Sequence, residues 1–316
     1  MYQEKRPSRS RFLNVRQQRY HVRSWGEPRP GEVPLVLLHG WMDVSASFQF
    51  VVDALQWERF VVAPDWRGFG LTREQGAGPS PFDYGRADHY WSADYLADLD
   101  VLLDRLDAEL GRAGAPVDLV GHSMGGNAAM LYAGVRPERV HRLVNLEGFG
   151  LPASRPAQAA RRYAAWIDQL KARQRGELDL QHYDSLEGVA RRLRKTNPRL
   201  DPGKALWLAQ HWSARGEDGR WQILGDPGHK VVNAMLYRAE EAQAVWRCIA
   251  APTLMVEATD DSLARWYQHG EFTRAEFHQR LEAVPDCRRA VVPDAGHMLH
   301  HDQPEAVARL IEDFLA

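Results

Sequence analysis

One serine in this chain of 316 residues stands in a setting that would make it a nucleophile. It is Ser123, at the centre of Gly121-His122-Ser123-Met124-Gly125, which fits the pattern G-x-S-x-G. The pattern is typical of a sharp strand-to-helix turn that lifts the serine hydroxyl above a sheet. Ser123 is therefore the candidate nucleophile for attack on a carbonyl carbon. The plainer interpretation is an ordinary serine in a glycine-rich turn.

A serine hydroxyl is a weak nucleophile until a neighbouring base takes its proton. Of the 13 histidines, His297 is the one that directly follows the last predicted strand and precedes the C-terminal helix. We expect it to lie over the ends of the strands as the general base. His300 and His301 follow shortly after it. The sequence shows no partner cluster that could complete a metal site with them. We therefore expect His300 and His301 to lie at the surface or to cap the helix that follows.

A histidine base needs a carboxylate that fixes its tautomer and stabilises the imidazolium. Two predicted loops supply candidates at the same edge of the sheet, one with Asp260 and Asp261 and the other with Glu147. The chain order Ser…Asp…His favours the later loop. Asp261 is therefore the preferred acid, and Glu147 and then Asp260 remain alternatives. Each is otherwise a loop carboxylate that caps a helix or turn.

The negative oxygen that forms during acyl transfer needs two N–H donors held in place. The amide of Met124, next to the nucleophile, is one candidate. The loop after the first predicted parallel strand, His39-Gly40-Trp41-Met42, supplies the other. Trp41 is the expected donor and Met42 is the alternative.

The elements that must position these residues alternate along the chain. Short apolar, β-branched runs predict buried parallel strands at 35–38, 60–63, 117–120, 140–146, 253–256 and 290–292. Helical patterns lie between or after them at 94–110, 124–135 and 304–314. Such alternation predicts an α/β fold, with a mostly parallel central sheet flanked by helices.

The alternation stops between residues 151 and 245, where the sequence is polar and helical and contains no good strand. We interpret this segment as a helical cap inserted between two core strands. The predicted organisation is a first part of the core at 1–150, the cap at 151–245, and a second part of the core at 246–316.

Composition excludes several classes of protein. The net charge of −2 lacks the basic excess of a nucleic-acid-binding protein. Two cysteines, Cys248 and Cys287, exclude a disulfide scaffold and a cysteine-rich zinc site. The basic N-terminus has no apolar stretch after it, and we expect a strand pair there rather than a secretory signal. No apolar run is long enough to cross a bilayer.

We therefore expect a cytoplasmic protein, a monomer or a homodimer. It should act on a small molecule and use no nucleic-acid or membrane partner. The sequence indicates no metal and no organic cofactor.

These motifs resemble those of the α/β-hydrolase superfamily, over almost the whole chain. Within it, the sequence looks most like the serine-hydrolase-like proteins, which carry a helical cap after the sixth strand. The resemblance implies a nucleophilic serine, His297 as base and a cap over the pocket. Ala258 departs from the pattern, since a glycine usually stands there, and the aspartate after it is doubled. The motifs that carry the resemblance are Leu38–Trp41, Pro64–Gly70, Gly121–Gly126 and Ala295–His297.

The resulting hypothesis is a serine hydrolase that cleaves a small carboxylic ester, thioester or lactone through an acyl-enzyme on Ser123. A serine at this turn disfavours dehalogenation and epoxide opening, for which relatives use an aspartate. The same turn also serves carbon–carbon bond hydrolases, lyases and cofactor-free peroxidases, and fold analogy does not separate them. A non-catalytic binding protein is the remaining alternative.

Overall fold

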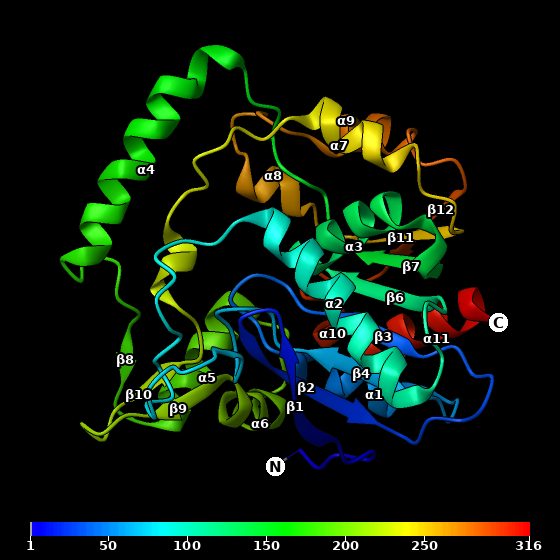
Figure 1. The fold of residues 1–316 in the computed structure, drawn as a ribbon, viewed down its shortest axis with the longest axis horizontal. Coiled ribbons are helices and arrows are strands. Elements are labelled where there is room, and N and C mark those ends of the chain that lie inside the picture. Colours follow the sequence, from blue (N-terminus) through cyan, green and yellow to red (C-terminus); the bar gives the residue numbers. More distant parts are fainter. Residues whose placement is uncertain (1) are drawn as a thin grey trace.

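The computed structural model describes residues 2–316, and its centre is a nine-stranded sheet (Figure 1). The strand order is β1-β2-β4-β3-β6-β7-β11-β12, and β5 pairs with β2 off this path. β1 and β2 are antiparallel, β2 and β4 are antiparallel, and the strands from β4 to β12 are parallel. The prediction of a mostly parallel sheet is confirmed. The strands are β1 Arg9–Val15, β2 Gln18–Trp25, β3 Leu35–Leu38, β4 Val61–Pro64, β5 Arg73–Glu74, β6 Val117–His122, β7 Val140–Leu146, β11 Thr253–Ala258 and β12 Cys287–Val292.

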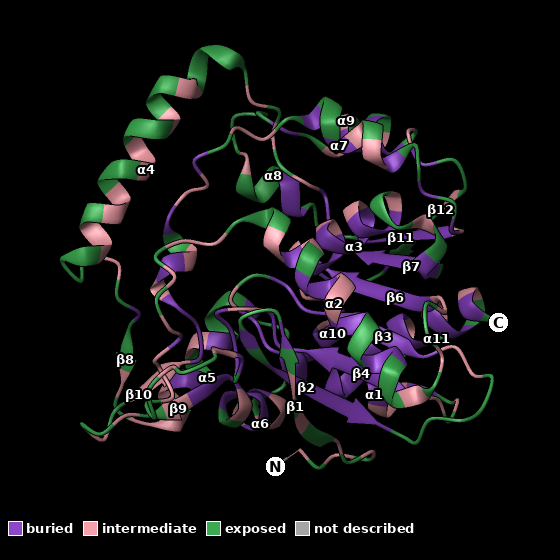
Figure 2. Cartoon of the chain, viewed as in Figure 1, coloured by how far each residue is buried: buried purple, intermediate pink, exposed green. Residues whose placement is uncertain are grey.

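Helices cover both faces of this sheet. α2 (Ser92–Leu110), α3 (Met124–Val135) and α9 (Arg274–Leu281) contribute to one apolar cluster. α1 (Gln49–Ala54), α10 (Leu299–Asp302) and α11 (Pro304–Leu315) contribute to another. Side chains of β3 alternate between the two clusters, as the pleat of a strand requires, so the clusters lie on opposite faces. Figure 2 shows the inner strands of this sheet as the buried centre of the molecule, whereas the edge strands β1 and β12 are largely exposed or intermediate.

The predicted helices match three helices of the structure. α3 has the predicted bounds, and α2 and α11 differ from them by one or two residues. Pro304 begins α11, where its missing N–H costs no hydrogen bond. Within residues 2–316, no helix combines the length and the apolar composition that crossing a membrane requires.

The segment between β7 and α7 (Ala239–Trp246) differs from expectation in one respect. It holds α4 (Ala159–Gln174), α5 (Leu186–Thr196) and α6 (Pro202–Trp212), as a helical segment should. It also holds a three-stranded sheet, so the expectation of no strand here was wrong. These strands are two or three residues long, which is too short for an alternating pattern to register. They are β8 His182–Tyr183, β9 Ser213–Arg215 and β10 Trp221–Ile223.

The helices of this segment differ in how closely they contact the core. α5 and α6 belong to a third apolar cluster that also contains Phe50 of α1, whose ring lies 5.7 Å from that of Trp207. α4 instead extends away from the sheet, and none of its residues is buried (Figures 1 and 2). α7, the helix that follows this segment, packs against α3.

The contact between α3 and α7 yields a stability prediction. A Cβ added at Gly134 would overlap the carbonyl oxygen of Val245. We expect Gly134→Ala to lower the free energy of unfolding by about 1–3 kcal/mol, the usual cost of overpacking, in urea denaturation. Gly188→Ala is the matched control, because its Cβ would lie 3.4 Å from the Tyr183 Cβ, an ordinary contact. Its better helix propensity should leave stability unchanged or slightly raised. Equal stabilities of the two variants would contradict the close approach.

Candidate active site

Ser123 lies in a strained turn between β6 and α3. Its φ is 53° and its ψ is −116°, a conformation that a serine rarely adopts. A Cβ at Gly121 would overlap the backbone of Gly125, so the turn requires a glycine there. The Ser123 amide donates to the Leu146 carbonyl at 2.8 Å, which ties the turn to the neighbouring strand β7. The serine hydroxyl is thereby held at the carboxyl edge of the sheet.

The loop after β3 packs against this turn. A Cβ on Gly40 would lie 3.2 Å from the Ser123 Cβ, so the loop backbone passes directly beside the nucleophile. The amide of Trp41, which follows Gly40, and the amide of Met124, which follows Ser123, have no hydrogen-bond acceptor within residues 2–316. The Trp41 side chain is 53% exposed and its indole donates to the His229 carbonyl at 3.3 Å. Trp41 and Met124 remain the predicted oxyanion donors.

His297 lies in the loop between β12 and α10 and faces the serine. Its Nε2 is 2.9 Å from Ser123 Oγ, within hydrogen-bond distance. The Trp266 ring packs edge-on against the imidazole, with ring centroids 4.4 Å apart. Burial lowers the pKa of His297 to about 4. The imidazole is therefore neutral at neutral pH, which is the form that accepts a proton.

The carboxylate beside His297 belongs to Glu147, the residue that follows β7. Glu147 Oε2 is 3.4 Å from His297 Nδ1. The side chain is buried, and it accepts hydrogen bonds from the Ala258 amide at 2.8 Å and from the Ser262 hydroxyl at 2.6 Å. Burial raises the pKa of Glu147 to about 7, and these hydrogen bonds oppose the rise. The sequence had ranked this residue second.

The preferred acid, Asp261, has a different role in the structure. Its Oδ1 caps α8 (Ser262–Trp266) by accepting from the Ala264 amide at 2.9 Å, and the side chain is 42% exposed. Asp260 forms two hydrogen bonds with Arg199, at 2.7 and 3.1 Å. Neither aspartate is bonded to His297. The structure brings together Ser123, His297 and Glu147.

Backbone strain is concentrated around this site. Among residues 2–316, five non-glycine residues have a positive φ, and four of them follow strands at the edge that holds the site. Each such residue costs about 1–3 kcal/mol, which the surrounding packing must offset. The four are Met42, Ser123, Glu147 and Asp294.

A second chain of serine, histidine and aspartate lies on the antiparallel side of the sheet. His21 Nε2 is 2.9 Å from Ser10 Oγ, and His21 Nδ1 is 2.7 Å from Asp65 Oδ2. Ser10 lies within β1, whose backbone is paired with β2, so no turn offers it free amides for an oxyanion. Asp65 also accepts from the amides of Ser45 and Leu71. We interpret this chain as a structural tie between loops.

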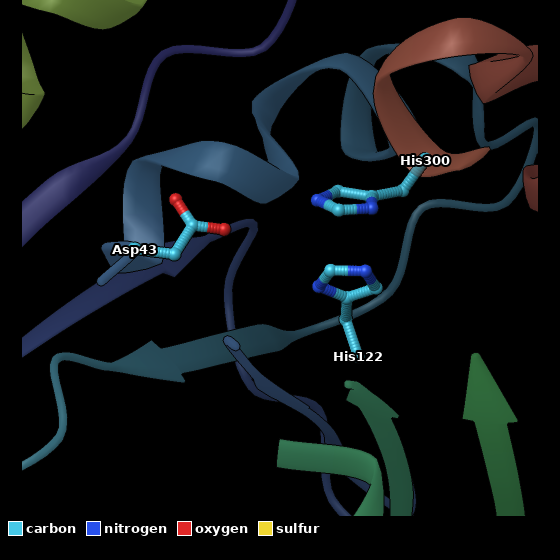
Figure 3. Close-up of side chains that lie close together, drawn as sticks. All are labelled: Asp43, His122 and His300. Carbon is cyan, nitrogen blue, oxygen red and sulfur yellow. The ribbon is translucent and has the colours of Figure 1, made fainter. Parts of the chain in front are cut away.

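Sequence reasoning missed a buried group behind the nucleophile turn. His300, expected at the surface, is fully buried, and its ring lies 4.2 Å from that of His122 (Figure 3). His301 is also buried. Asp43 completes the group, and burial raises its pKa to about 7. Burial lowers the pKa values of His122 and His300 well below the usual range, so both rings are neutral.

Comparisons with known proteins place this geometry in a wider context. A family model described as the alpha/beta hydrolase fold matches residues 33–304. A serine hydrolase-like protein of Danio rerio is 26% identical over 92% of this chain and 86% of its own length. A 2-hydroxy-6-oxo-2,4-heptadienoate hydrolase of Pseudomonas putida is 36% identical, over 37% of this chain and 38% of its own.

Proteins of known structure have a similar fold. The thioesterase domain from the curacin biosynthetic pathway superimposes with a TM-score of 0.77. The match covers 97% of this chain and 99% of that one at 23% identity. At this identity, the likeness is one of fold.

The burial of His297 leads to a prediction about its titration. We expect the imidazole to stay neutral at pH 6 and to protonate near pH 4, because desolvation disfavours the charged ring. The ¹⁵N NMR shifts of its ring nitrogens, assigned with a His297→Gln variant, would follow the titration. A midpoint at or above the ordinary histidine pKa would contradict this account.

Proposed function

Because this chain belongs to the α/β-hydrolase fold family, we propose that it is a serine hydrolase acting on a small carboxylic ester, thioester or lactone. The observation that carries the proposal is the contact of 2.9 Å between Ser123 Oγ and His297 Nε2 on the strained turn. A hydroxyl that only hydrogen-bonds locally does not require this costly backbone conformation.

In the proposed reaction, His297 takes the Ser123 proton as Oγ attacks the substrate carbonyl carbon. The resulting imidazolium then protonates the leaving alcohol, thiol or lactone oxygen, and the acyl group stays on Ser123. Water, activated by the same imidazole, attacks the acyl carbon, and the carboxylic acid leaves. The amides of Trp41 and Met124 are the proposed donors to the negative oxygen in both steps.

We assign the acid of this mechanism to Glu147 rather than Asp261. A neutral imidazole becomes a cation in the transition state, and a carboxylate beside Nδ1 stabilises it. Glu147 is at 3.4 Å from that nitrogen and is fixed by two hydrogen bonds. Asp261 is occupied as a helix cap and points to solvent.

The proposed substrate has an apolar part. Trp266, which packs against His297, is 46% exposed, and Trp41, which follows Gly40 in the loop beside Ser123, is 53% exposed. Exposed indoles at a reactive site favour an acyl or alcohol chain that covers them. Residues 151–245 are the proposed cap, and we expect the apolar part of the substrate to pass this cap on its way to Ser123.

A carbon–carbon bond hydrolase is the alternative that a specific observation favours. The Pseudomonas putida relative, named a 2-hydroxy-6-oxo-2,4-heptadienoate hydrolase, is more similar in identity than the Danio rerio relative, although over a shorter segment. Turnover of a vinylogous diketone without turnover of any ester would favour this alternative.

The first functional prediction concerns the nucleophile. We expect Ser123→Ala to lose labelling by a fluorophosphonate probe and to lower hydrolysis of p-nitrophenyl esters by at least about 10³-fold, because the acyl-enzyme no longer forms. An ester series of graded chain length would measure the preference for an apolar chain. Ser10→Ala is the matched control and should retain both activities. Unlabelled, folded wild-type protein would refute the proposal.

The second functional prediction separates the two candidate acids. Glu147→Gln should lower kcat by on the order of 10⁴-fold, because the imidazolium loses its carboxylate. Asp261→Asn should change kcat only a few-fold, because the residue caps α8 at the surface. Steady-state kinetics of both variants on the best ester measure the difference. A larger loss in Asp261→Asn would reverse the assignment.

A further inference from the structure

The loop that holds Trp41, a proposed donor to the negative oxygen, connects two parts of the molecule. It follows β3 and consists of residues 40–42, which we call the donor loop. On the core side, a Cβ added at Gly40 would lie 3.2 Å from the Ser123 Cβ. The start of the donor loop is therefore held against the nucleophile turn.

The rest of the donor loop is bonded to the proposed cap. The Trp212 indole N–H donates to the Met42 carbonyl at 2.9 Å. The Trp41 indole N–H donates to the His229 carbonyl at 3.3 Å. Both partners belong to residues 151–245. The donor loop thus lies between the nucleophile turn on one side and the proposed cap on the other.

Met42 needs support because its backbone is strained. Its φ is 53°, in the left-handed region that a methionine rarely adopts. Such a conformation persists only where the surroundings hold it. Within residues 2–316, its carbonyl accepts one hydrogen bond, from Trp212, whose side chain is 8% exposed. Without that bond, Met42 can relax toward an ordinary φ, and the relaxation shifts the adjoining residue Trp41.

Trp212 has a fixed position from which to provide this support. It ends α6, which packs against α5 and against η1 (Ser45–Phe48), the short helix that follows the donor loop. Its carbonyl accepts from the Leu224 amide at 2.9 Å. A Cβ added at Gly225, the next residue, would lie 3.1 Å from Met42 Sδ. Both the indole and the neighbouring backbone therefore contact Met42.

We propose that Trp212 is a positioning residue of the reaction, which holds the Met42 carbonyl and thereby keeps the Trp41 amide in place to donate to the negative oxygen. This inference rests on the proposed function, because it concerns a donor of that mechanism. A donor that is held in place before the reaction stabilises the developing charge without a cost of reorganisation. The cap then takes part in catalysis, besides covering the pocket.

The alternative is a purely structural role, in which Trp212 only attaches α6 to the core, and Trp207 separates the two roles. Trp207 lies on the same helix, is 6% exposed, and donates its indole N–H to Glu4 at 3.0 Å. Its ring packs against those of Tyr2 and Phe50 rather than against the donor loop. A phenylalanine at either position removes one indole N–H and keeps an aromatic ring.

Steady-state kinetics on the best p-nitrophenyl ester test the proposal. Trp212→Phe should lower kcat by at least about tenfold and leave KM within about twofold, because the displaced donor acts in the transition state and not on the bound substrate. Trp207→Phe is the matched control and should keep both constants within about twofold of the wild type, because its bond does not reach the donor loop. Equal kcat values for the two variants, or a change confined to KM, would overturn the proposal.

A spectroscopic test does not require activity. In protein labelled with ¹⁵N tryptophan, the indole N–H resonance of Trp41, assigned with Trp41→Phe, should shift and broaden in Trp212→Phe. It should stay unchanged in Trp207→Phe, because only the loss of the Met42 bond releases the donor loop. An unchanged Trp41 resonance in an active wild type's Trp212→Phe variant overturns the positioning role alone. A wild type that neither hydrolyses esters nor reacts with the fluorophosphonate refutes the proposed function, and the positioning role fails with it.

A measurement on the wild type covers the case in which Trp212→Phe does not fold. The fluorophosphonate adduct of Ser123 places a phosphonyl oxygen where the negative oxygen of the intermediate would lie. The Trp212 indole N–H should then exchange with water at least about fivefold more slowly, because coupling between two sites is reciprocal. The Trp207 indole N–H should exchange at the same rate with and without the adduct. An unchanged rate at Trp212 would overturn the proposal.

Discussion

The turn at Ser123 is the constraint on which the site depends. A backbone at φ 53° and ψ −116° is unfavourable for a serine, and only the surrounding packing can maintain it. β6 fixes its start and α3 fixes its end, while the hydrogen bond from the Ser123 amide to the Leu146 carbonyl ties the turn to β7. Gly125 allows the close approach, because a Cβ there would overlap the carbonyl oxygen of Leu38 in β3. The buried sheet thus acts as the support for one hydroxyl.

The second organising feature is a carboxyl group kept in the interior. Glu147 is 1% exposed, and its two oxygens are each bonded by a donor from the chain around β11. An ionised carboxylate in this position is costly unless such donors are present. The same burial that raises the pKa of Glu147 lowers that of His297. Both groups therefore favour their neutral forms more than they would in water, and the hydrogen bonds from Ala258 and Ser262 oppose this effect at Glu147.

Much of this arrangement could be predicted from local patterns. Ser123 and His297 were found because each is marked by neighbouring residues and by its place between a strand and a helix. The acid was not fixed in this way, since β7 and β11 are adjacent and parallel, and both loops end at the same edge. The choice between them depends on the positive φ of Glu147 and on donors more than 100 residues away. The convergence of Asp43, His122 and His300 is likewise tertiary, so each appears ordinary in its own stretch of sequence.

The contact between Asp260 and Arg199 has a consequence for how this architecture can diversify. Ser123, Glu147 and His297 all lie outside residues 151–245; the first two precede this segment in the chain and His297 follows it. Residues 151–245 contact the core in different ways. Arg199 and Asp260 form a half-exposed ion pair, a kind of contact that contributes little stability, whereas α5 and α6 share a buried apolar cluster with Phe50 of α1. An exchange of this segment between relatives would therefore have to preserve the apolar contact, not the ion pair.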